Sequence, residues 1–144
     1  MTDEWDEALI ETDDDGGGGE EADSGDQPEP KYPNVEEWVI GWFAPIIRRR
    51  LTGDHCWCPQ WWQHPEVISR LDALWRSWEA LRLDPTTGMS VWWRDHFGPH
   101  WAELVDRDRS PMSRCGTEAG HVGEHPELVV ERAPAGTWGP DTEA

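Results

Sequence analysis

Cysteine and histidine side chains gather in two stretches of this 144-residue chain, residues 55–64 and residues 115–125. They are His55, Cys56, Cys58, His64, Cys115, His121 and His125. Zinc in proteins takes four thiolate or imidazole ligands, often as two short-range pairs that the fold brings together. Cys58 with His64, and Cys115 with His121, form two such pairs.

The sequence therefore predicts a zinc site made by Cys58, Cys115 and His121, with His64 or His125 as the fourth ligand. Such a site would hold the glycine- and proline-bearing stretch 106–131 on the rest of the domain. The spacing is not that of a standard zinc finger, and a second interpretation stays open. In it the three cysteines are free thiols, the histidines lie on the surface, and His64 caps a helix.

A second group with chemical potential is Asp95, His96 and His100, with Glu103 nearby. If the helix is continuous, His96 and His100 share one face and could form an acid/base pair or a metal site. Equally, Asp95 could pair with Arg94 on the surface, and His96 and His100 could donate hydrogen bonds at a helix end. The chain has no nucleophile elbow, phosphate-binding loop or His-Glu-x-x-His motif. These observations favour a non-catalytic protein, with a metal-assisted hydrolase acting on nucleic acid as the alternative.

Apolar residues at spacings of three and four predict helices that would position these groups. The first helix is expected over about residues 35–51, capped by Asn34, with a kink near Ala44 because Pro45 removes a backbone donor. Arg48–Arg50 would then lie in its last turn, where cations complement the helix dipole; a phosphate-binding patch is the other interpretation.

The second helix is expected to begin at His64-Pro65 and to end before Asp84-Pro85. A third is expected from about Ser90 to Gly98. Pro99 would either start a short fourth helix that ends near Val105 or bend a continuous one. The alternating stretch 127–132 is the only weak strand pattern. The predicted fold is all-α, a small arrangement of three or four helices.

Tryptophan is the most unusual feature of the composition, because ten of the twelve tryptophans lie between Trp38 and Trp101. Those on the apolar stripes are expected in the core: Trp38, Trp42, Trp75 and Trp78. Neighbours on a helix point about 100° apart, so one member of each pair, Trp61-Trp62 and Trp92-Trp93, should leave the stripe. An exposed Trp62 or Trp93 would serve as an anchor for a protein partner.

The net charge of -18 is concentrated at the N-terminus, because residues 1–30 hold 13 acidic side chains and no basic one. We expect a disordered acidic tail over residues 1–32, a helical domain over 33–131 and a flexible C-terminal tail over 132–144. Trp5, Ala8, Leu9 and Ile10 form an apolar group in the acidic tail. That group either binds a groove on a partner or is incidental to a solubilising tail.

Composition also bears on location and partners. No stretch approaches the roughly 18 apolar residues of a membrane span, and the start of the chain lacks a signal-peptide pattern. We therefore expect a soluble cytoplasmic protein. Direct nucleic-acid binding is disfavoured because the chain is acidic and its basic residues are scattered. A protein partner is the expectation that remains.

Four sequence motifs resemble an actinobacterial domain of unknown function over about residues 33–121. They are Pro33-Asn-Val-Glu-Glu-Trp38, Trp57-Cys-Pro-Gln-Trp-Trp-Gln-His-Pro-Glu66, Leu74-Trp-Arg-Ser-Trp-Glu-Ala-Leu-Arg-Leu-Asp84, and Gly88-Met-Ser-Val-Trp-Trp-Arg-Asp-His96 with Pro99-His100. The resemblance implies an accessory protein of a mobile genetic element, a plasmid or phage. The chain departs from the family pattern at Cys56 and in the histidine-bearing stretch after Cys115. Together these observations predict a non-catalytic adaptor that binds another protein of that element.

Overall fold

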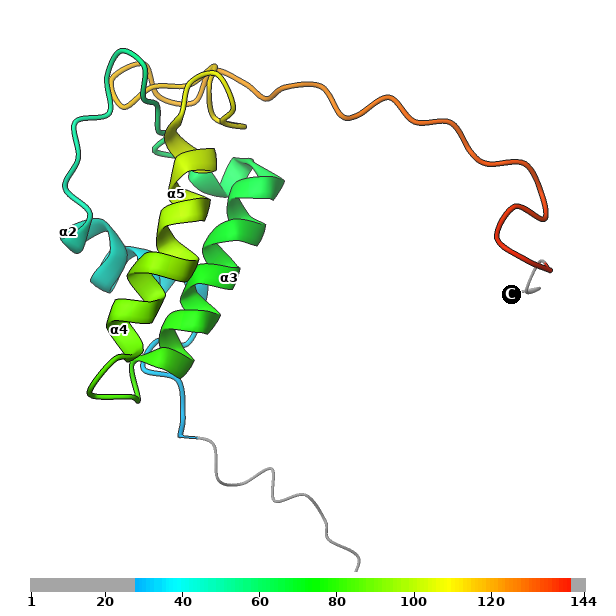
Figure 1. Ribbon diagram of the computed structural model, residues 1–144. Helices are drawn as coiled ribbons and strands as arrows, with labels where there is room; N and C mark the ends of the chain where they lie inside the picture. Colours follow the sequence, from blue (N-terminus) through cyan, green and yellow to red (C-terminus); the bar gives the residue numbers. More distant parts are fainter. Residues whose placement is uncertain (1–27, 141–144) are drawn as a thin grey trace, which may run out of the picture.

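The computed structural model describes residues 28–140, which form an all-α domain without strands in that range (Figure 1). Trp5 and most of the predicted acidic tail lie outside the described residues. Three helical segments pack together, joined by loops and a short 3₁₀ turn, η2. The elements are α1 (Val35–Trp38), η1 (Val39–Phe43), α2 (Ala44–Ile46), η2 (Trp61–Gln63), α3 (Pro65–Leu81), α4 (Gly88–Val91), η3 (Trp92–Phe97) and α5 (Gly98–Val105).

Two prolines lie inside helical segments, and in each case a π-helical turn ends two residues before the proline. The turns are η1, ahead of Pro45, and η3, ahead of Pro99. Proline has no N–H and its ring clashes with the carbonyl of an ordinary α-helical turn. At both places the residue before the proline donates to the carbonyl five positions earlier, Ala44 to Val39 and Gly98 to Trp93. The wider turn carries the helix past the proline, so α4, η3 and α5 form one continuous segment.

The first helical segment is shorter than the sequence predicted. It ends at Ile46 rather than near residue 51, because Ile47 adopts an extended conformation. The free carbonyls at this end are satisfied locally: Ile47 N–H donates to Phe43 O over 2.9 Å, and Arg48 Nε donates to Pro45 O over 3.2 Å. The run Arg48–Arg50 therefore lies in the following loop, exposed to solvent, and not in the last helical turn.

The core is a continuous cluster of aromatic rings between the three segments. Trp38 and Trp92 are fully buried, and Trp42 contacts both, at ring-centroid distances of 5.8 and 5.5 Å. Trp92 also donates its indole N–H to Leu74 O over 3.0 Å, which fixes it against α3. Trp78 is buried as expected, while Trp42 and Trp75 are half-buried at the edge of the core.

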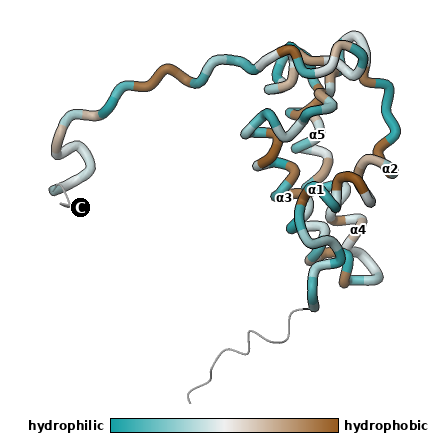
Figure 2. The backbone as a smooth tube through the Cα atoms, turned by 180° about the vertical axis from the view of Figure 1, so that it is seen from behind, coloured by the Kyte–Doolittle hydropathy of each residue, from teal (hydrophilic) through white to brown (hydrophobic). Residues whose placement is uncertain are grey.

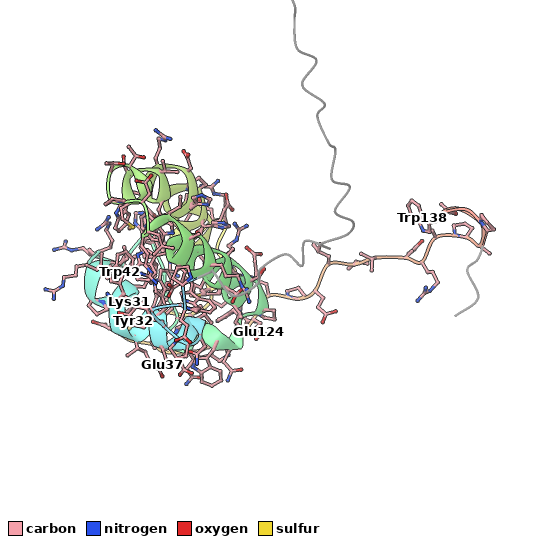
Figure 3. All side chains as sticks on the ribbon, turned by 90° about the horizontal axis from the view of Figure 1, so that it is seen from below. Lys31, Tyr32, Glu37, Trp42, Glu124 and Trp138 are labelled. Carbon is pink, nitrogen blue, oxygen red and sulfur yellow. The ribbon has the colours of Figure 1, made fainter. Side chains whose placement is uncertain are left out.

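Glu79 of α3 binds the backbone of residues 31–32, which precede the first helix. Its carboxylate accepts hydrogen bonds from the backbone N–H groups of Lys31 and Tyr32 over 2.9 and 3.0 Å, and from Arg82 and Trp75. The Tyr32 ring packs on Trp78. Figure 3 shows Lys31 and Tyr32 lying against the bundle. The packed part of the chain thus begins at or before residue 31.

A tight turn joins α3 to α4. The carboxylate of Asp84 accepts hydrogen bonds from the hydroxyls and backbone N–H groups of Thr86 and Thr87, which lower the pKa of Asp84 to about 2. Gly88 follows, and a Cβ atom there would lie 1.9 Å from the backbone O of Leu81. The close approach of the two helices at this turn therefore requires glycine.

Between the end of α5 and residue 140 the chain has no helix or extended strand. Residues 106–125 fold back over one end of the bundle, and the later residues run away from it as an extended segment (Figures 1 and 2). Leu128, Val129 and Val130 are 82–99% exposed, so the weak strand pattern of residues 127–132 forms no strand. Trp138 lies still farther out and is 91% exposed (Figure 3).

Between residues 28 and 140, none of the helices combines the length and the apolar character that crossing a bilayer requires.

Replacing Gly88 with alanine should destabilise the domain by about 3 kcal/mol, because the new methyl group meets rigid backbone. Gly98→Ala is the matched control: a Cβ there meets only Trp93 O, at 3.6 Å. That helical substitution should stabilise by about 0.5–1 kcal/mol. Urea unfolding of both variants measures the difference, and equal stabilities would contradict the packing described for this turn.

Replacing Glu79 with glutamine should lower the melting temperature at pH 7, at a cost of about 2 kcal/mol. Burial alone would raise the pKa of Glu79, but the hydrogen bonds from Lys31, Arg82, Tyr32 and Trp75 outweigh it and hold the pKa below 4.5. The charged form stabilises the fold above the unfolded-state pKa, and this contribution is lost as pH falls through the folded-state pKa. The free energies of unfolding of the two proteins should therefore converge as pH falls below the folded-state pKa of Glu79. The exposed pair Glu103–Arg109 supplies the control Glu103→Gln, expected to change stability by less than about 1 kcal/mol.

Candidate metal centre

Two loops that are far apart in the sequence meet at one end of the helical bundle, above the start of α3 and the end of α5 (Figure 1). The backbone joins them directly: Cys56 N–H donates to Val105 O over 2.8 Å, and Arg107 N–H donates to Asp54 O over 2.9 Å. The loop after α2 is thereby held beside the loop after α5. Cys58 and Cys115 are carried on these two loops.

Arg107 adds a side-chain connection between the same loops. Its guanidinium donates to three backbone carbonyls, Gly53 O at 2.7 Å, His55 O at 3.1 Å and Ser113 O at 2.9 Å. A planar fork of five donors suits this task, because one side chain can satisfy acceptors on both loops at once. Arg107 therefore fixes the distance between the segment that carries Cys58 and the segment that carries Cys115.

Four potential ligands converge where these loops meet the N-terminus of α3: Cys58, His64, Cys115 and His121. One ligand atom from each residue lies within 4.8 Å of the other three. Cys58 Sγ is 3.3 Å from His121 Nδ1, and Cys115 Sγ is 3.6 Å from His64 Nε2 and 3.7 Å from His121 Nδ1. Cys58, His64 and Cys115 are buried, and His121 is half-buried.

The three sulfur–nitrogen separations are close to the edges of a tetrahedron around a metal ion. Zn–S bonds of about 2.3 Å and Zn–N bonds of about 2.0–2.1 Å place a sulfur and a nitrogen about 3.6 Å apart. Two sulfur and two imidazole nitrogen donors are also the set that suits zinc, whereas magnesium and calcium prefer oxygen. The cluster therefore fits a metal ion such as zinc in both its geometry and its donor chemistry.

Local structure between Cys115 and His121 explains how that pair is formed. Gly116 and Gly120 exchange two backbone hydrogen bonds, of 3.2 and 2.8 Å, which close a small loop. Gly120 has φ of +75°, a conformation that favours glycine. Just after the loop, Val122 N–H donates to Cys115 Sγ over 3.4 Å, a contact that would stabilise a thiolate there.

Burial shifts the pKa values of two of the ligands, Cys58 and His64. It raises the pKa of the Cys58 thiol to about 11, so a metal ion would have to displace the thiol proton. Burial also lowers the pKa of His64, and the neighbouring charge of His121 lowers it further. His64 is thus neutral at pH 7, which is the form that binds metals.

His64 takes the fourth position that the sequence left open between His64 and His125. It occupies the N-cap position of α3, but its side chain makes no capping hydrogen bond and is only 1% exposed. His125 instead contacts the hydroxyl of Ser113. Cys56 is buried in the core without joining the cluster, and His55 is exposed. The interpretation of His64 as a helix cap therefore does not describe its environment, whereas His55 and His125 are exposed as that interpretation expects.

The alternative catalytic group lies elsewhere, on the surface of η3 and α5. Asp95 is exposed and pairs with Arg94 over 2.8 Å, while His100 Nδ1 is 3.1 Å from an Arg70 nitrogen. Burial and the charge of Arg70 lower the pKa of His100. Among the described residues, metal-ligand groups of three or more comprise only the Cys/His cluster. The hydrolase alternative, with His96, stays a prediction.

The two tryptophans predicted as anchors differ in their surroundings. Trp62 of η2 is 52% exposed, beside the buried Trp61. Trp93 is half-buried, and its ring lies 4.8 Å from Trp92 and 4.8 Å from Phe97. Trp62 is thus the one of the two that presents a large apolar surface to solvent. Whether either residue binds a partner stays a prediction.

Two residues that support the cluster were not singled out from the sequence. No sequence pattern marks Arg107, because the three carbonyls that it binds come together only in the folded loops. Met112, fully buried, accepts the backbone N–H of Cys58 on its sulfur over 3.4 Å. An apolar side chain three residues before Cys115 was the only available signal.

Comparison with known proteins places the chain in a family context. A family model described as "Domain of unknown function (DUF4913)" matches residues 32–134, which include all four residues of the Cys/His cluster. No curated protein matches the chain. No solved structure matches it either.

The purified protein should contain about one zinc ion per chain by elemental analysis. Cys58→Ser and Cys115→Ser should each lose most of this zinc, because each removes one of four ligands. Cys56→Ser is the matched control, since Cys56 is equally buried but stands outside the cluster. Metal-free protein with a normal fold, or equal zinc loss in all three variants, would contradict this assignment.

Proposed function

We propose that this chain, which belongs to the DUF4913 family, is a zinc-stabilised, non-catalytic adaptor that binds another protein. The observation that carries the proposal is the cluster of Cys58, His64, Cys115 and His121, because its donor set is complete. Catalytic zinc sites keep one position open for water or substrate, whereas structural sites have four protein ligands. Four protein ligands, three of them buried, fit the structural class.

The bound metal would supply the stability that residues 106–125 lack. This stretch has no helix or strand, and its buried apolar side chains are few. A short irregular segment buries too little apolar surface to offset its ordering entropy. A metal bound to Cys115 and His121 on one side, and to Cys58 and His64 on the other, would hold it on the helices.

An apolar groove next to this end of the domain supports the adaptor role. We define the groove by ten residues, all apolar, from the first helical segment, the loop after it, η2 and α5: Val39, Ile40, Phe43, Ala44, Ile47, Leu51, Trp57, Pro59, Trp61 and Trp101. Ile40 is 60% exposed. Concentrated apolar surface on a small soluble domain typically marks a protein interface.

The cluster and the groove are connected through one loop. Residues 47–59 supply Ile47, Leu51 and Trp57 to the groove and Cys58 to the cluster. Trp57 also packs on Trp101 of α5, with 6.1 Å between ring centroids. A metal that holds Cys58 therefore also holds one wall of the groove, so the binding surface would depend on the metal.

We place this adaptor among the accessory proteins of a mobile genetic element, a plasmid or phage. The motifs that resemble such proteins support this context, including Trp57-Cys-Pro-Gln-Trp-Trp and Met89-Ser-Val-Trp-Trp-Arg-Asp-His96. The partner would then be another protein of the same element.

Affinity capture from cells that carry the element tests the adaptor role. The full chain should retain a specific protein, and Ile40→Asp should reduce its recovery at least about tenfold, because a charge in an apolar interface costs more than about 1.4 kcal/mol. Trp62→Ala tests the predicted anchor in the same assay. Leu83→Asp is the matched control, since Leu83 is 49% exposed but does not line the groove. It lies two residues past the C-terminal end of α3, whereas the η2 part of the groove precedes the N-terminal end. Equal recovery with Ile40→Asp and with Leu83→Asp would contradict the role of the groove.

A further inference from the structure

The apolar groove has a strongly basic edge. Ile47 and Leu51 line it, and the three residues between them in the chain are Arg48, Arg49 and Arg50, all exposed. Arg48 is held at the end of α2 by its bond to Pro45 O, and no ion pair within residues 28–140 involves the three arginines. Three adjacent cations beside an apolar surface fit a ligand that is both acidic and apolar.

Residues 3–11 of the same chain have this chemistry. The segment reads Asp-Glu-Trp-Asp-Glu-Ala-Leu-Ile-Glu and lies outside the described residues. In a helix, Trp5, Ala8 and Leu9 would share one face, because they are spaced at three and four residues. Glu4, Asp6 and Glu11 would flank that face, and Asp3 and Glu7 would lie on the opposite side. The segment therefore offers an apolar stripe to the groove and carboxylates to the arginines.

The connecting chain is long enough to bring the segment to the groove. Residues 12–27 link it to Pro28, after which the chain packs on α3. For a linker of 16 residues with four consecutive glycines, at 16–19, chain statistics give a root-mean-square length of about 20–24 Å. The radius of gyration of a 100-residue domain is only about 13 Å. Such a tether gives an effective concentration of about 1 mM, so even a weak contact would be populated.

We infer that residues 3–11 dock in the apolar groove of their own chain, with Trp5 and Leu9 against its apolar wall and the carboxylates against Arg48–Arg50. This inference rests on the proposed function in one respect: it takes the groove to be the surface for which an external partner competes. The tail then lowers the affinity of the groove for that partner. A phosphate group alone would satisfy the arginines but not the ten apolar residues beside them.

Nuclear magnetic resonance of the ¹⁵N-labelled full chain tests the inference through the indole N–H signals. Trp5→Ala should shift the signals of Trp57 and Trp101, which line the groove. Arg49→Glu should shift them in the same direction and move the Trp5 signal toward the value of an unfolded peptide. Salt at about 0.5 M should act like Arg49→Glu, because it screens exposed charges. Trp138→Ala, in an exposed segment away from the groove, should shift neither groove signal.

Unchanged Trp57 and Trp101 signals in Trp5→Ala would overturn the inference. So would shifts that grow with protein concentration, because they would show that a second copy supplies the segment. Arg49 is exposed, and the spread of the other signals will show whether Arg49→Glu keeps the fold. Failure of tail docking leaves the Ile40→Asp capture result unchanged, and failure of partner capture leaves these signals unchanged. The two proposals can therefore fail separately.

Discussion

Four side chains from the loop before η2, the start of α3 and the loop after α5 converge on one point, and the arrangement of that end of the molecule depends on them. Cys58 and His64 come from one side, and Cys115 and His121 from the other. The backbone bonds between the loops and the fork of Arg107 bring these ligands close together. A metal ion would convert that proximity into a cross-link over about 50 residues, which is the kind of constraint a small irregular segment needs.

Aromatic rings between the helices form the larger part of the core, and Cys58, Met112 and Cys115 belong to the same buried hydrophobic cluster. The aromatic part is built from stacked and edge-on rings between Trp38, Trp42, Trp78 and Trp92, and the two π-helical turns let helices containing Pro45 and Pro99 pack without a break. The segment 47–63 contacts the helices and also carries Cys58. One wall of the apolar groove is therefore made by helical residues, and the other is made by residues of this segment. The shape of the groove would therefore be sensitive to a metal bound at the Cys/His cluster.

Much of this organisation was predictable from residue types and spacing. Helix α3 followed from Pro65 and an apolar stripe, and the Cys58/His64 and Cys115/His121 pairs followed from ligand chemistry. The choice of His64 over His125 was not predictable, because it depends on which ring the fold buries. The early end of the first helix and the π turns also escaped prediction: sequence periodicity does not distinguish an α turn from a π turn, and only tertiary packing shows that Ile47 and Leu51 face a groove.

X-ray absorption at the zinc edge of the purified full chain tests the central claim most directly, because it reads the ligand atoms themselves. The account predicts a four-coordinate ion with two sulfur neighbours at about 2.3 Å and two nitrogen neighbours at about 2.0–2.1 Å. A spectrum with a single sulfur, or with nitrogen and oxygen neighbours only, would contradict the assignment to Cys58, His64, Cys115 and His121.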